Sequence, residues 1–189
     1  MKQGTTQLNS FNNDSYKVGA GLLKRFLWYV CNMLFFNSYL LPFYYPKTLL
    51  LRAFGAQVGK GLVIKPKVNI KYPWKLQVGN HVWIGEQVWI DNLDQVRILD
   101  HVCVSQGALL LCGNHNYKKS SFDLITAPII LEEGVWIGAQ CIVTGGCVCG
   151  SHSVLTVGSV ASKNLEPYTL YKGNPAQSIK TRNIEHAQN

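Results

Sequence analysis

The chain has 189 residues, of which 47% are hydrophobic and 15% charged, with a formal net charge of +8 and a pI of about 9.2. This length predicts a single domain, and the composition excludes a chain that is disordered throughout. A basic surface suits nucleic acid, an anionic membrane or a phosphorylated ligand. The sequence has no run of five basic residues and no nucleic-acid-binding motif, so we expect no nucleic-acid partner.

The N-terminal part divides into a polar segment and an aromatic one. Residues 1–15 show no periodic pattern and predict a mobile tail, whereas residues 16–57 are rich in Leu, Phe, Trp and Tyr at roughly helical spacing. Polar residues and Pro42 interrupt the apolar run, which argues against a membrane-spanning helix. The segment either packs on the end or side of the main domain or lies in a membrane interface. The second interpretation places Lys17, Lys24 and Arg25 near anionic lipid and Trp28, Phe35 and Phe36 in the interfacial region.

From residue 58 onward an aliphatic residue recurs every six positions. The register skips two residues after each of the first two groups of three, and it is interrupted once by a longer insertion. Thirteen of its fifteen positions are Val, Ile or Leu. The fifteen positions are Val58, Ile64, Ile70, Val78, Ile84, Ile90, Ile98, Val104, Leu110, Leu131, Ile137, Val143, Cys149, Leu155 and Ala161.

This period predicts short strands joined by tight corners, with three strands closing one triangular coil. A single coil cannot bury its apolar face, so successive coils stack and cover one another. We therefore expect an all-β, parallel β-helix over residues 58–163. Its five coils are 58–77, 78–97, 98–115, 131–148 and 149–163, with an inserted loop at 114–128 and a C-terminal tail at 164–189.

The cysteines point to a reducing compartment. The first fifteen residues lack the apolar core of a secretory signal, and no CxxC pair of a zinc site is present. Most of the cysteines fall on repeat positions that require a small apolar side chain. We therefore predict reduced structural thiols in a cytoplasmic protein, with contact to the inner face of the membrane left open.

Several segments resemble the hexapeptide-repeat acetyltransferases: VWIGA at 135–139, GS at 158–159 and KGNPAQSIK at 172–180. The resemblance covers roughly residues 22 to 182 and is strongest to the colanic acid biosynthesis acetyltransferases, which are related to maltose and galactoside O-acetyltransferases. It implies a left-handed β-helix and a homotrimer with active sites between subunits. It also implies acetyl-CoA as a co-substrate, with no permanently bound cofactor.

The inserted loop suggests a function, because stacked coils do not need it. His115 stands at its start, and the resemblance implies that it is the general base that deprotonates a sugar hydroxyl attacking the thioester. The family usually has an acidic or other polar residue next, where this chain has Asn116, so the group that orients the imidazole stays open. A backbone carbonyl is one candidate, and a backbone N–H of a neighbouring coil is the expected oxyanion donor. The alternative is a solvated loop histidine.

The pantetheine arm of acetyl-CoA would lie along coil edges where small side chains leave room. Gln177 stands where related sugar acetyltransferases often carry arginine, so Lys180 is the favoured phosphate contact. The alternative for each glycine and serine is ordinary corner geometry. The residues implied on the cofactor side are Trp136, Gly138, Ala139, Gly158, Ser159, Ser162, Lys163 and Lys180, with Lys172 and Arg182 as further basic candidates.

For the acceptor, the candidate contacts are Asp91, Asn92, Asn116 and Tyr117, and Tyr117 could stack on a pyranose ring. The alternative is a merely polar outer surface. The resulting hypothesis is an O-acetyltransferase acting on a saccharide, or a lipid-linked saccharide, in exopolysaccharide or cell-surface glycan biosynthesis. Two alternatives remain: the acceptor is an amino group of serine or an amino sugar, or the β-helix is a non-catalytic scaffold.

Three histidines test a different class of enzyme. His81, His101 and His152 occupy outward positions in three coils, and β-helical carbonic anhydrases hold zinc through three histidines, two of them in an H-x4-H pair. No two histidines of this chain are five residues apart. We therefore expect no metal site.

Overall fold

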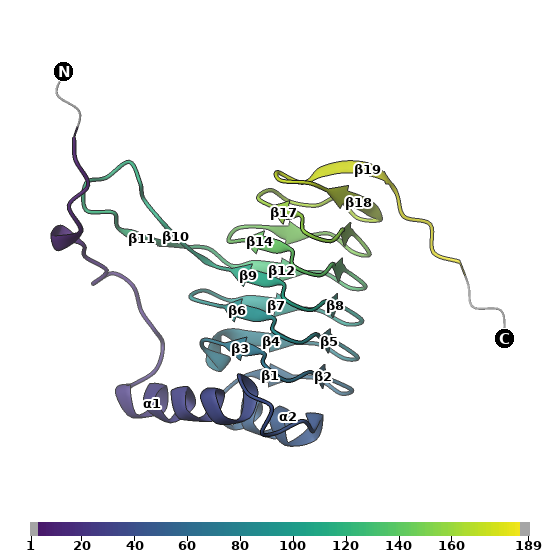
Figure 1. Cartoon of the computed structure of the whole chain (residues 1–189), viewed down its shortest axis with the longest axis horizontal. Helices are drawn as coiled ribbons and strands as arrows, with labels where there is room; N and C mark the ends of the chain where they lie inside the picture. Colours follow the sequence, from purple (N-terminus) through teal and green to yellow (C-terminus); the bar gives the residue numbers. More distant parts are fainter. Residues whose placement is uncertain (1–3, 186–189) are drawn as a thin grey trace.

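Three parallel sheets form the faces of a triangular prism, and the chain passes from sheet A to B to C in each coil (Figure 1). The computed structural model describes residues 4–185. Sheet A contains β1 (Gln57–Val58), β4 (Leu76–Val78), β7 (Val96–Ile98), β12 (Ile129–Leu131) and β15 (Val148–Cys149). Sheet B contains β2 (Val63–Ile64), β5 (Trp83–Ile84), β8 (Cys103–Val104), β13 (Trp136–Ile137), β16 (Val154–Leu155), β18 (Thr169–Lys172) and β19 (Gln177–Thr181). Sheet C contains β3 (Asn69–Ile70), β6 (Trp89–Asp91), β9 (Leu109–Leu111), β14 (Ile142–Thr144) and β17 (Val160–Ala161).

The aliphatic repeat positions stack directly on one another inside the prism. In sheet B, for example, Ile64 pairs with Ile84, and Ile84 with Val104. Fourteen of the fifteen repeat positions are buried, and Val58 in the first coil is half-buried. Burying one such side chain contributes about 1.5–3 kcal/mol, so the stacked positions provide the main stabilisation of the coils. The predicted parallel β-helix is confirmed.

The stack extends beyond residue 163, where we expected a tail. β18 pairs in parallel with β16, and β19 folds back antiparallel onto β18. Leu165 and Tyr171 lie six residues apart and are both buried, with Tyr171 in register with Leu155. They continue the repeat after a shortened corner, so a sixth coil begins here. Residues 186–189 of the expected tail lie outside the described part.

Two helices lie beneath the first coil: α1 (Leu22–Cys31), which continues into a π-helical turn η2 (Asn32–Phe36), and α2 (Tyr44–Ala53). Trp28 and Phe36 are buried among core residues and Phe35 packs against them, so these three side chains are not available to a membrane interface as the interfacial interpretation required. The segment packs on the end of the prism. Among residues 4–185, no helix is long and apolar enough to cross a membrane.

The helical segment bonds to the first coil beside all three faces, and on sheets A and C it pairs groups of the open edge. Arg52 donates from Nε and Nη2 to the carbonyl of Val58, at 3.1 and 2.8 Å, beside sheet A. The buried Lys47 donates to the carbonyl of Lys65 at 3.2 Å beyond sheet B, and burial lowers the pKa of Lys47. On sheet C, the Trp28 indole donates to the carbonyl of Ile70 at 2.8 Å, and Asn32 accepts from its N–H at 3.2 Å. The carbonyls of Val58 and Ile70, which a preceding coil would satisfy, are thereby paired.

The cysteines are buried and unbridged. None of the six forms a disulfide, and only Cys103 is partly exposed. Burial raises the pKa of the Cys31 thiol to about 11 and that of Cys112 to about 12. Such thiols are poor nucleophiles at neutral pH, because the reactive form is the thiolate. They pack in the chain as small apolar side chains.

Candidate active site

A β-hairpin leaves the prism at the corner between sheets C and A, where the repeat is interrupted. Its strands β10 (Gly113–His115) and β11 (Leu124–Thr126) pair antiparallel, with His115 opposite Leu124. The N-terminal segment runs along this hairpin (Figure 1): Gln7 donates its N–H to the carbonyl of Ser120 at 2.8 Å, and the rings of Phe11 and His115 lie 5.9 Å apart. Residues 4–15, expected within a mobile tail, therefore have defined contacts near His115, whereas residues 1–3 lie outside the described part.

The imidazole of His115 is held by Phe122. Its Nδ1 lies 2.8 Å from the carbonyl oxygen of Phe122, and the two rings stack at 4.4 Å with an interplanar angle of 7°. A carbonyl only accepts, so Nδ1 carries the proton in this hydrogen bond and Nε2 keeps its lone pair. Phe122 has a φ of 51°, a conformation uncommon for an aromatic residue, in which this carbonyl reaches the ring. A backbone carbonyl thus orients the ring, one of the candidates that the sequence left open.

The residues after His115 belong to the turn of the hairpin. The backbone N–H of Asn116 donates to the carbonyl of Asp123 at 2.8 Å, and its side-chain oxygen accepts from the N–H of Lys118 at 3.2 Å. Tyr117 is 76% exposed and is free to meet a ligand. The side chain of Asn116 thus supports the turn rather than the imidazole.

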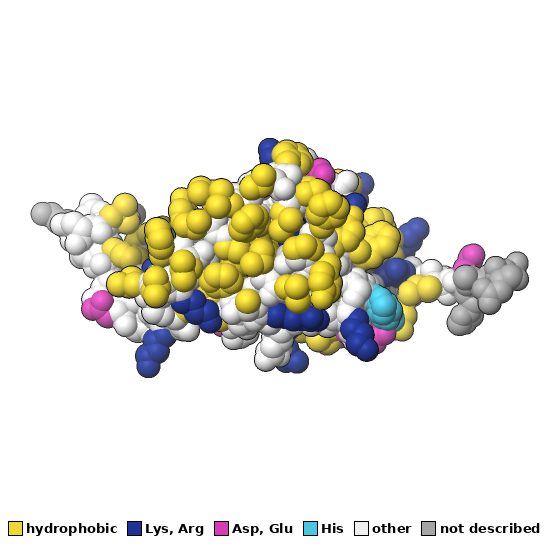
Figure 2. Space-filling view, turned by 90° about the horizontal axis from the view of Figure 1, so that it is seen from below, with side chains coloured by type: hydrophobic (Ala, Val, Ile, Leu, Met, Phe, Trp, Pro, Cys, Tyr) yellow, Lys and Arg dark blue, Asp and Glu magenta, His cyan; other side chains and the backbone are white. Residues whose placement is uncertain are grey.

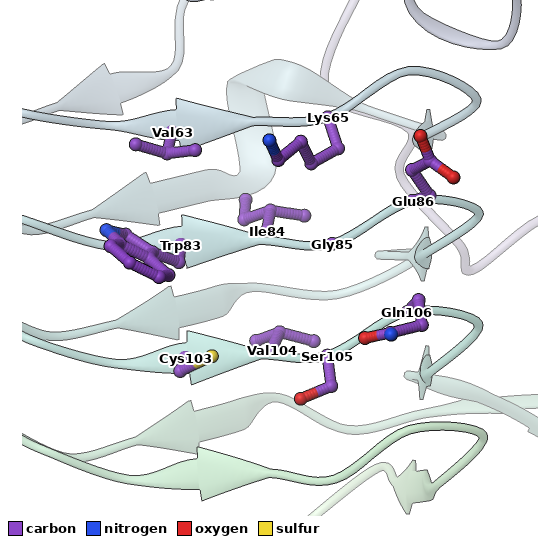
Figure 3. A pocket seen from close by; sticks show the side chains of 10 residues that line it. All are labelled: Val63, Lys65, Trp83, Ile84, Gly85, Glu86, Cys103, Val104, Ser105 and Gln106. Carbon is purple, nitrogen blue, oxygen red and sulfur yellow. The ribbon is translucent and has the colours of Figure 1, made fainter.

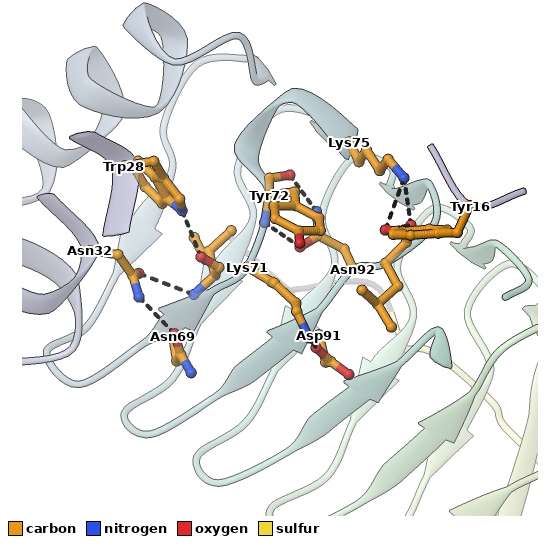
Figure 4. Close-up of polar contacts among 11 residues, drawn as sticks. Tyr16, Trp28, Asn32, Asn69, Lys71, Tyr72, Lys75, Asp91 and Asn92 are labelled. Carbon is orange, nitrogen blue, oxygen red and sulfur yellow. Dashed lines mark hydrogen bonds and ion pairs between the residues drawn. The ribbon is translucent and has the colours of Figure 1, made fainter. Parts of the chain in front are cut away.

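A buried carboxylate lies beside the start of the hairpin. Asp91, at the end of β6, forms an ion pair with Lys71 at 2.9 Å (Figure 4). Its Oδ2 is 3.9 Å from the position that a Cβ would take on Gly113, two residues before His115. The same position lies only 2.5 Å from Cδ1 of Leu93, so Leu93 packs against the backbone of Gly113 and a larger residue would collide with it. Asp91 and His115 are brought to the same region of the molecule.

Asn92 has a structural role. It is fully buried, accepting from the N–H of Tyr72 at 2.9 Å and donating to the carbonyl of Tyr72 at 2.6 Å (Figure 4). Both polar ends of the amide are used to hold the previous coil. The Asn92 side chain is fully buried, so its contact with an acceptor remains a prediction.

We expect Asn92→Ala to lower the free energy of unfolding by about 1–3 kcal/mol, because it leaves buried groups of Tyr72 unpaired. Chemical denaturation measures this loss. Asn183→Ala, at an exposed asparagine, is the matched control and should change stability by less than about 0.5 kcal/mol. Equal stability of the two variants would contradict a structural role for Asn92.

The predicted cofactor residues fall mainly at the corner between sheets B and C. Gly158 is exposed there, with a φ of 69° and no atom within 4 Å of the position that a Cβ would take, so the edge beside it is open. Ala139 accepts the N–H of Gly158 at 2.9 Å. A Cβ on Gly138 would lie 2.7 Å from the carbonyl of Leu155, so this glycine is required by coil packing. Ser159 is buried, and its hydroxyl accepts from the N–H of Gly173 at 3.0 Å, so it too is structural.

The basic candidates differ in availability. Lys163, with Ser162, is exposed after β17, and Lys172 and Lys180 are exposed on β18 and β19. Arg182 instead donates to the carbonyls of Gly134 and His152, both at 3.0 Å, and so fastens the last strand to the prism. Both bonds use Nη1, and its contact with phosphate remains a prediction. Gln177, at the position of the missing arginine, is exposed on β19.

Within one chain, these groups do not form a single site. His115 projects from the corner between sheets C and A, whereas Ala139 and Gly158 lie at the corner between sheets B and C. The two corners are opposite sides of the face formed by sheet C. Within one chain, His115 and the open edge beside Gly158 therefore lie at different corners of the prism.

The sequence did not reveal a groove of about 320 Å³ on sheet B (Figure 3). Trp83, 60% exposed, Cys103 and Ser105 line it. Trp136 lies beside it and donates to the Ser105 hydroxyl at 2.9 Å. With Trp89 on sheet C, exposed tryptophans stand on both sides of the corner between sheets B and C. An exposed aromatic surface of this kind is typical of a contact with another protein surface.

The outward histidines lie at corners of the coils. The rings of His81 and His101 stack at 5.3 Å, and His152 packs against Tyr168. Within residues 4–185, no group of three or more His, Cys, Asp or Glu side chains is arranged to hold a metal ion.

No protein-family model matches the chain. It is 33% identical over 164 residues to "Putative colanic acid biosynthesis acetyltransferase WcaF" of Escherichia coli K12, with 87% of this chain and 90% of that protein covered. It is 25% identical over 137 residues to the galactoside O-acetyltransferase of the same organism, covering 71% of this chain and 68% of the other.

Solved structures share the fold. A galactoside acetyltransferase in complex with coenzyme A superposes with a TM-score of 0.75 at 23% identity, covering 85% of this chain and 82% of that one. A hexapeptide-repeat acetyltransferase of Vibrio cholerae, complexed with acetyl-coenzyme A, gives a TM-score of 0.68 at 24% identity, with 74% and 78% covered. Together with the confirmed repeat and the extent of the similarity to the colanic acid biosynthesis relative, these findings show that the chain belongs to the hexapeptide-repeat acetyltransferases.

Proposed function

We propose that this acetyltransferase moves the acetyl group of acetyl-CoA to a hydroxyl of a saccharide, with His115 as general base. The observation that carries the proposal is the hydrogen bond between His115 Nδ1 and the Phe122 carbonyl, which leaves the lone pair of Nε2 for a proton. The relatives named for colanic acid biosynthesis and galactoside acetylation support a saccharide acceptor in exopolysaccharide or cell-surface glycan synthesis. The six unbridged thiols fit a cytoplasmic protein.

The proposed reaction is direct transfer in a ternary complex. Nε2 of His115 accepts the proton of the sugar hydroxyl while the oxygen attacks the thioester carbonyl. The tetrahedral intermediate collapses, its C–S bond breaks, and the leaving thiolate takes the proton from the imidazolium. The products are an acetyl ester and the free thiol of CoA. The Phe122 carbonyl stabilises the imidazolium through the Nδ1–H, as hydrogen-bond partners at Nδ1 do for other catalytic histidines.

We infer that the site is completed between copies in a homotrimer. The corner between sheets B and C carries the exposed tryptophans and the open edge beside Gly158, where the pantetheine arm of acetyl-CoA would lie. The hairpin of a neighbouring copy would bring His115 to that edge. Lys163 and Lys180 are exposed and suited to the phosphates of CoA, whereas Trp136 flanks the arm. CoA is a co-substrate that leaves after each turnover.

On the acceptor side, we assign Asp91 and Tyr117. The Asp91 carboxylate lies beside the start of the hairpin and can accept hydrogen bonds from sugar hydroxyls. Tyr117 offers an aromatic face at the hairpin turn. These two contacts favour a polyhydroxylated acceptor.

The experiment is a screen of saccharides, amino sugars and serine with acetyl-CoA, monitored by release of free thiol and by the mass of the product. We expect transfer to a saccharide with a product whose acetyl group is removed by mild alkali, as an ester is. An alkali-stable amide would identify an amino acceptor and contradict the proposal. Absence of thiol release with every acceptor, from protein that binds acetyl-CoA, would favour a non-catalytic scaffold.

We expect Phe122→Asn to lower kcat about tenfold with little change in KM for acetyl-CoA. Asparagine tolerates the positive φ and keeps the backbone carbonyl, but the stacked ring that fixes the imidazole is lost. Steady-state kinetics measures both constants. Ser120→Asn, in the same turn, is the control and should retain full activity; an unchanged kcat in Phe122→Asn would show that the stack does not position the base.

A further inference from the structure

The end of the prism below the first coil carries an exposed apolar surface, shown in Figure 2. We call it the base patch, and its principal members come from α1, from the segment that leads into α2 and from the first turn of α2. They are Leu22, Leu23, Phe26, Leu40, Phe43 and Tyr45, all of them more than 60% exposed. The opposite side of the helical segment packs against the first coil through Trp28 and Phe36. The base patch therefore faces away from the β-helix and is not covered by it.

The charge of the chain is concentrated at this end. Residues 15–85, which form the helices and the first coils, contain ten Lys and Arg residues and no Asp or Glu. The rest of the chain contains eight basic and ten acidic residues. The whole net positive charge therefore lies in the segment around the base patch. Figure 2 shows Lys and Arg side chains along its border, and Arg25, Arg52 and Lys60 are exposed there.

We propose that the base patch docks on the surface of an anionic lipid bilayer. An apolar surface of Leu, Phe and Tyr bordered by cations matches a membrane interface, where the acyl boundary takes up the apolar side chains and anionic head groups attract the basic ones. The attraction of exposed Lys and Arg to such a surface falls off within a Debye length, so high salt weakens it. The helices lie flat against the end of the prism, so the contact is peripheral.

Charge argues against a second copy as the occupant. Two base patches facing each other would bring the cations of both copies together without an acidic partner in that segment. An anionic bilayer removes this repulsion and replaces it with attraction. A side-by-side trimer, by contrast, would direct three base patches to the same surface and multiply the affinity.

The docking also places the proposed acceptor region near the bilayer. A cleft of about 590 Å³ runs between α1 and sheet C, and its lining includes Phe26 of the base patch and Lys71, the partner of Asp91. The cleft thus connects the base patch with the region of Asp91. This arrangement suits an acceptor saccharide whose lipid carrier remains in the membrane, an inference that rests on the proposed function. The membrane contact itself does not depend on the identity of the acceptor.

The test is flotation of the full-length protein with vesicles of phosphatidylcholine alone or with 30% phosphatidylglycerol, an anionic fraction of roughly the scale found on natural surfaces. We expect flotation with the anionic vesicles, weakened by high salt. The double variant Leu23→Ser/Leu40→Ser should reduce the bound fraction at least tenfold, because it removes two apolar side chains of the base patch that lie outside the cleft. The matched control is Ile179→Ser/Ile184→Ser, two exposed isoleucines at the other end of the chain, which should float like the wild type.

Thermal unfolding and thiol release with a soluble acceptor accompany each variant. Unchanged values in Leu23→Ser/Leu40→Ser would separate membrane docking from the fold and from acetyl transfer. Wild-type protein that stays with the soluble fraction, or a base-patch variant that floats as well as the control, would overturn the proposal. A third result would identify another copy of the chain as the occupant and would also overturn the proposal. In that case the wild type does not bind vesicles, and the base-patch variant elutes from gel filtration as a smaller assembly than the wild type.

Discussion

The largest effect on catalysis is expected for His115→Asn, which should lower kcat about 10²–10⁴-fold, the range attributed to one general acid–base group. Asparagine fills a similar space but cannot take a proton at neutral pH. The thioester and the acceptor would still bind, so the KM for acetyl-CoA should change little. Stopped-time measurement of free thiol with saturating substrates gives kcat directly.

The control is the same substitution at a histidine far from the hairpin. His81→Asn removes an exposed imidazole at a coil corner, where the φ of 54° is one that asparagine tolerates. We expect full activity from this variant and unchanged unfolding from both. Activity of His115→Asn above about a tenth of the wild type would contradict the assigned role of His115 as general base.

The largest effect on stability is expected for Leu110→Ala, which should lower the free energy of unfolding by about 2–5 kcal/mol. Leu110 is fully buried and lies in register between Ile90 below and Val143 above. The chain leaves the prism three residues later, so the coil at this level is closed by the hairpin corner instead of by a regular corner. The substitution leaves a cavity in the core. The coils above and below are held by their own strand hydrogen bonds, so their side chains can fill this cavity only in part.

Differential scanning calorimetry measures the effect, which for a chain of this size corresponds to a lowering of Tm by about 4–20 °C. Ile179→Ala removes a comparable aliphatic group from an exposed position on β19 and should shift Tm by about 1–2 °C at most. If the two variants unfold alike, the stacked repeat positions do not provide the main stabilisation of the coils.

The repeat was predictable because its period is a local property of the sequence. Six-residue spacing determines which side chains point inward, and all fifteen positions lie in the three ladders. Leu165 and Tyr171 keep the same spacing after a shorter corner, and the shift in register hid the sixth coil. The repeat also predicts that His115 and Gly158 lie at different corners. His115 follows a repeat position of sheet C, whereas Gly158 follows one of sheet B.

The roles of the polar residues could not be predicted in this way. Asn92, Ser159 and Arg182 have the side chains of ligand contacts, yet all three bond to backbone groups in neighbouring coils. Which group a polar side chain reaches depends on the stacking of residues far apart in the sequence. The carbonyl of Phe122 reaches His115 because Phe122 itself adopts a positive φ. No pattern of residue types in the sequence predicts this conformation.

The way in which both ends of the β-helix are closed bears on the size of the protein. A stack of parallel strands is a template for further strands at either end, and unlimited addition produces a fibre. Here the side chains of Arg52 and Trp28 occupy hydrogen-bonding groups of sheets A and C at one end. At the other end β19 runs against the parallel direction, with an irregular register and the exposed Lys180 on its edge. Both ends are thus poor templates for a further parallel strand, which disfavours end-to-end growth of the β-helix.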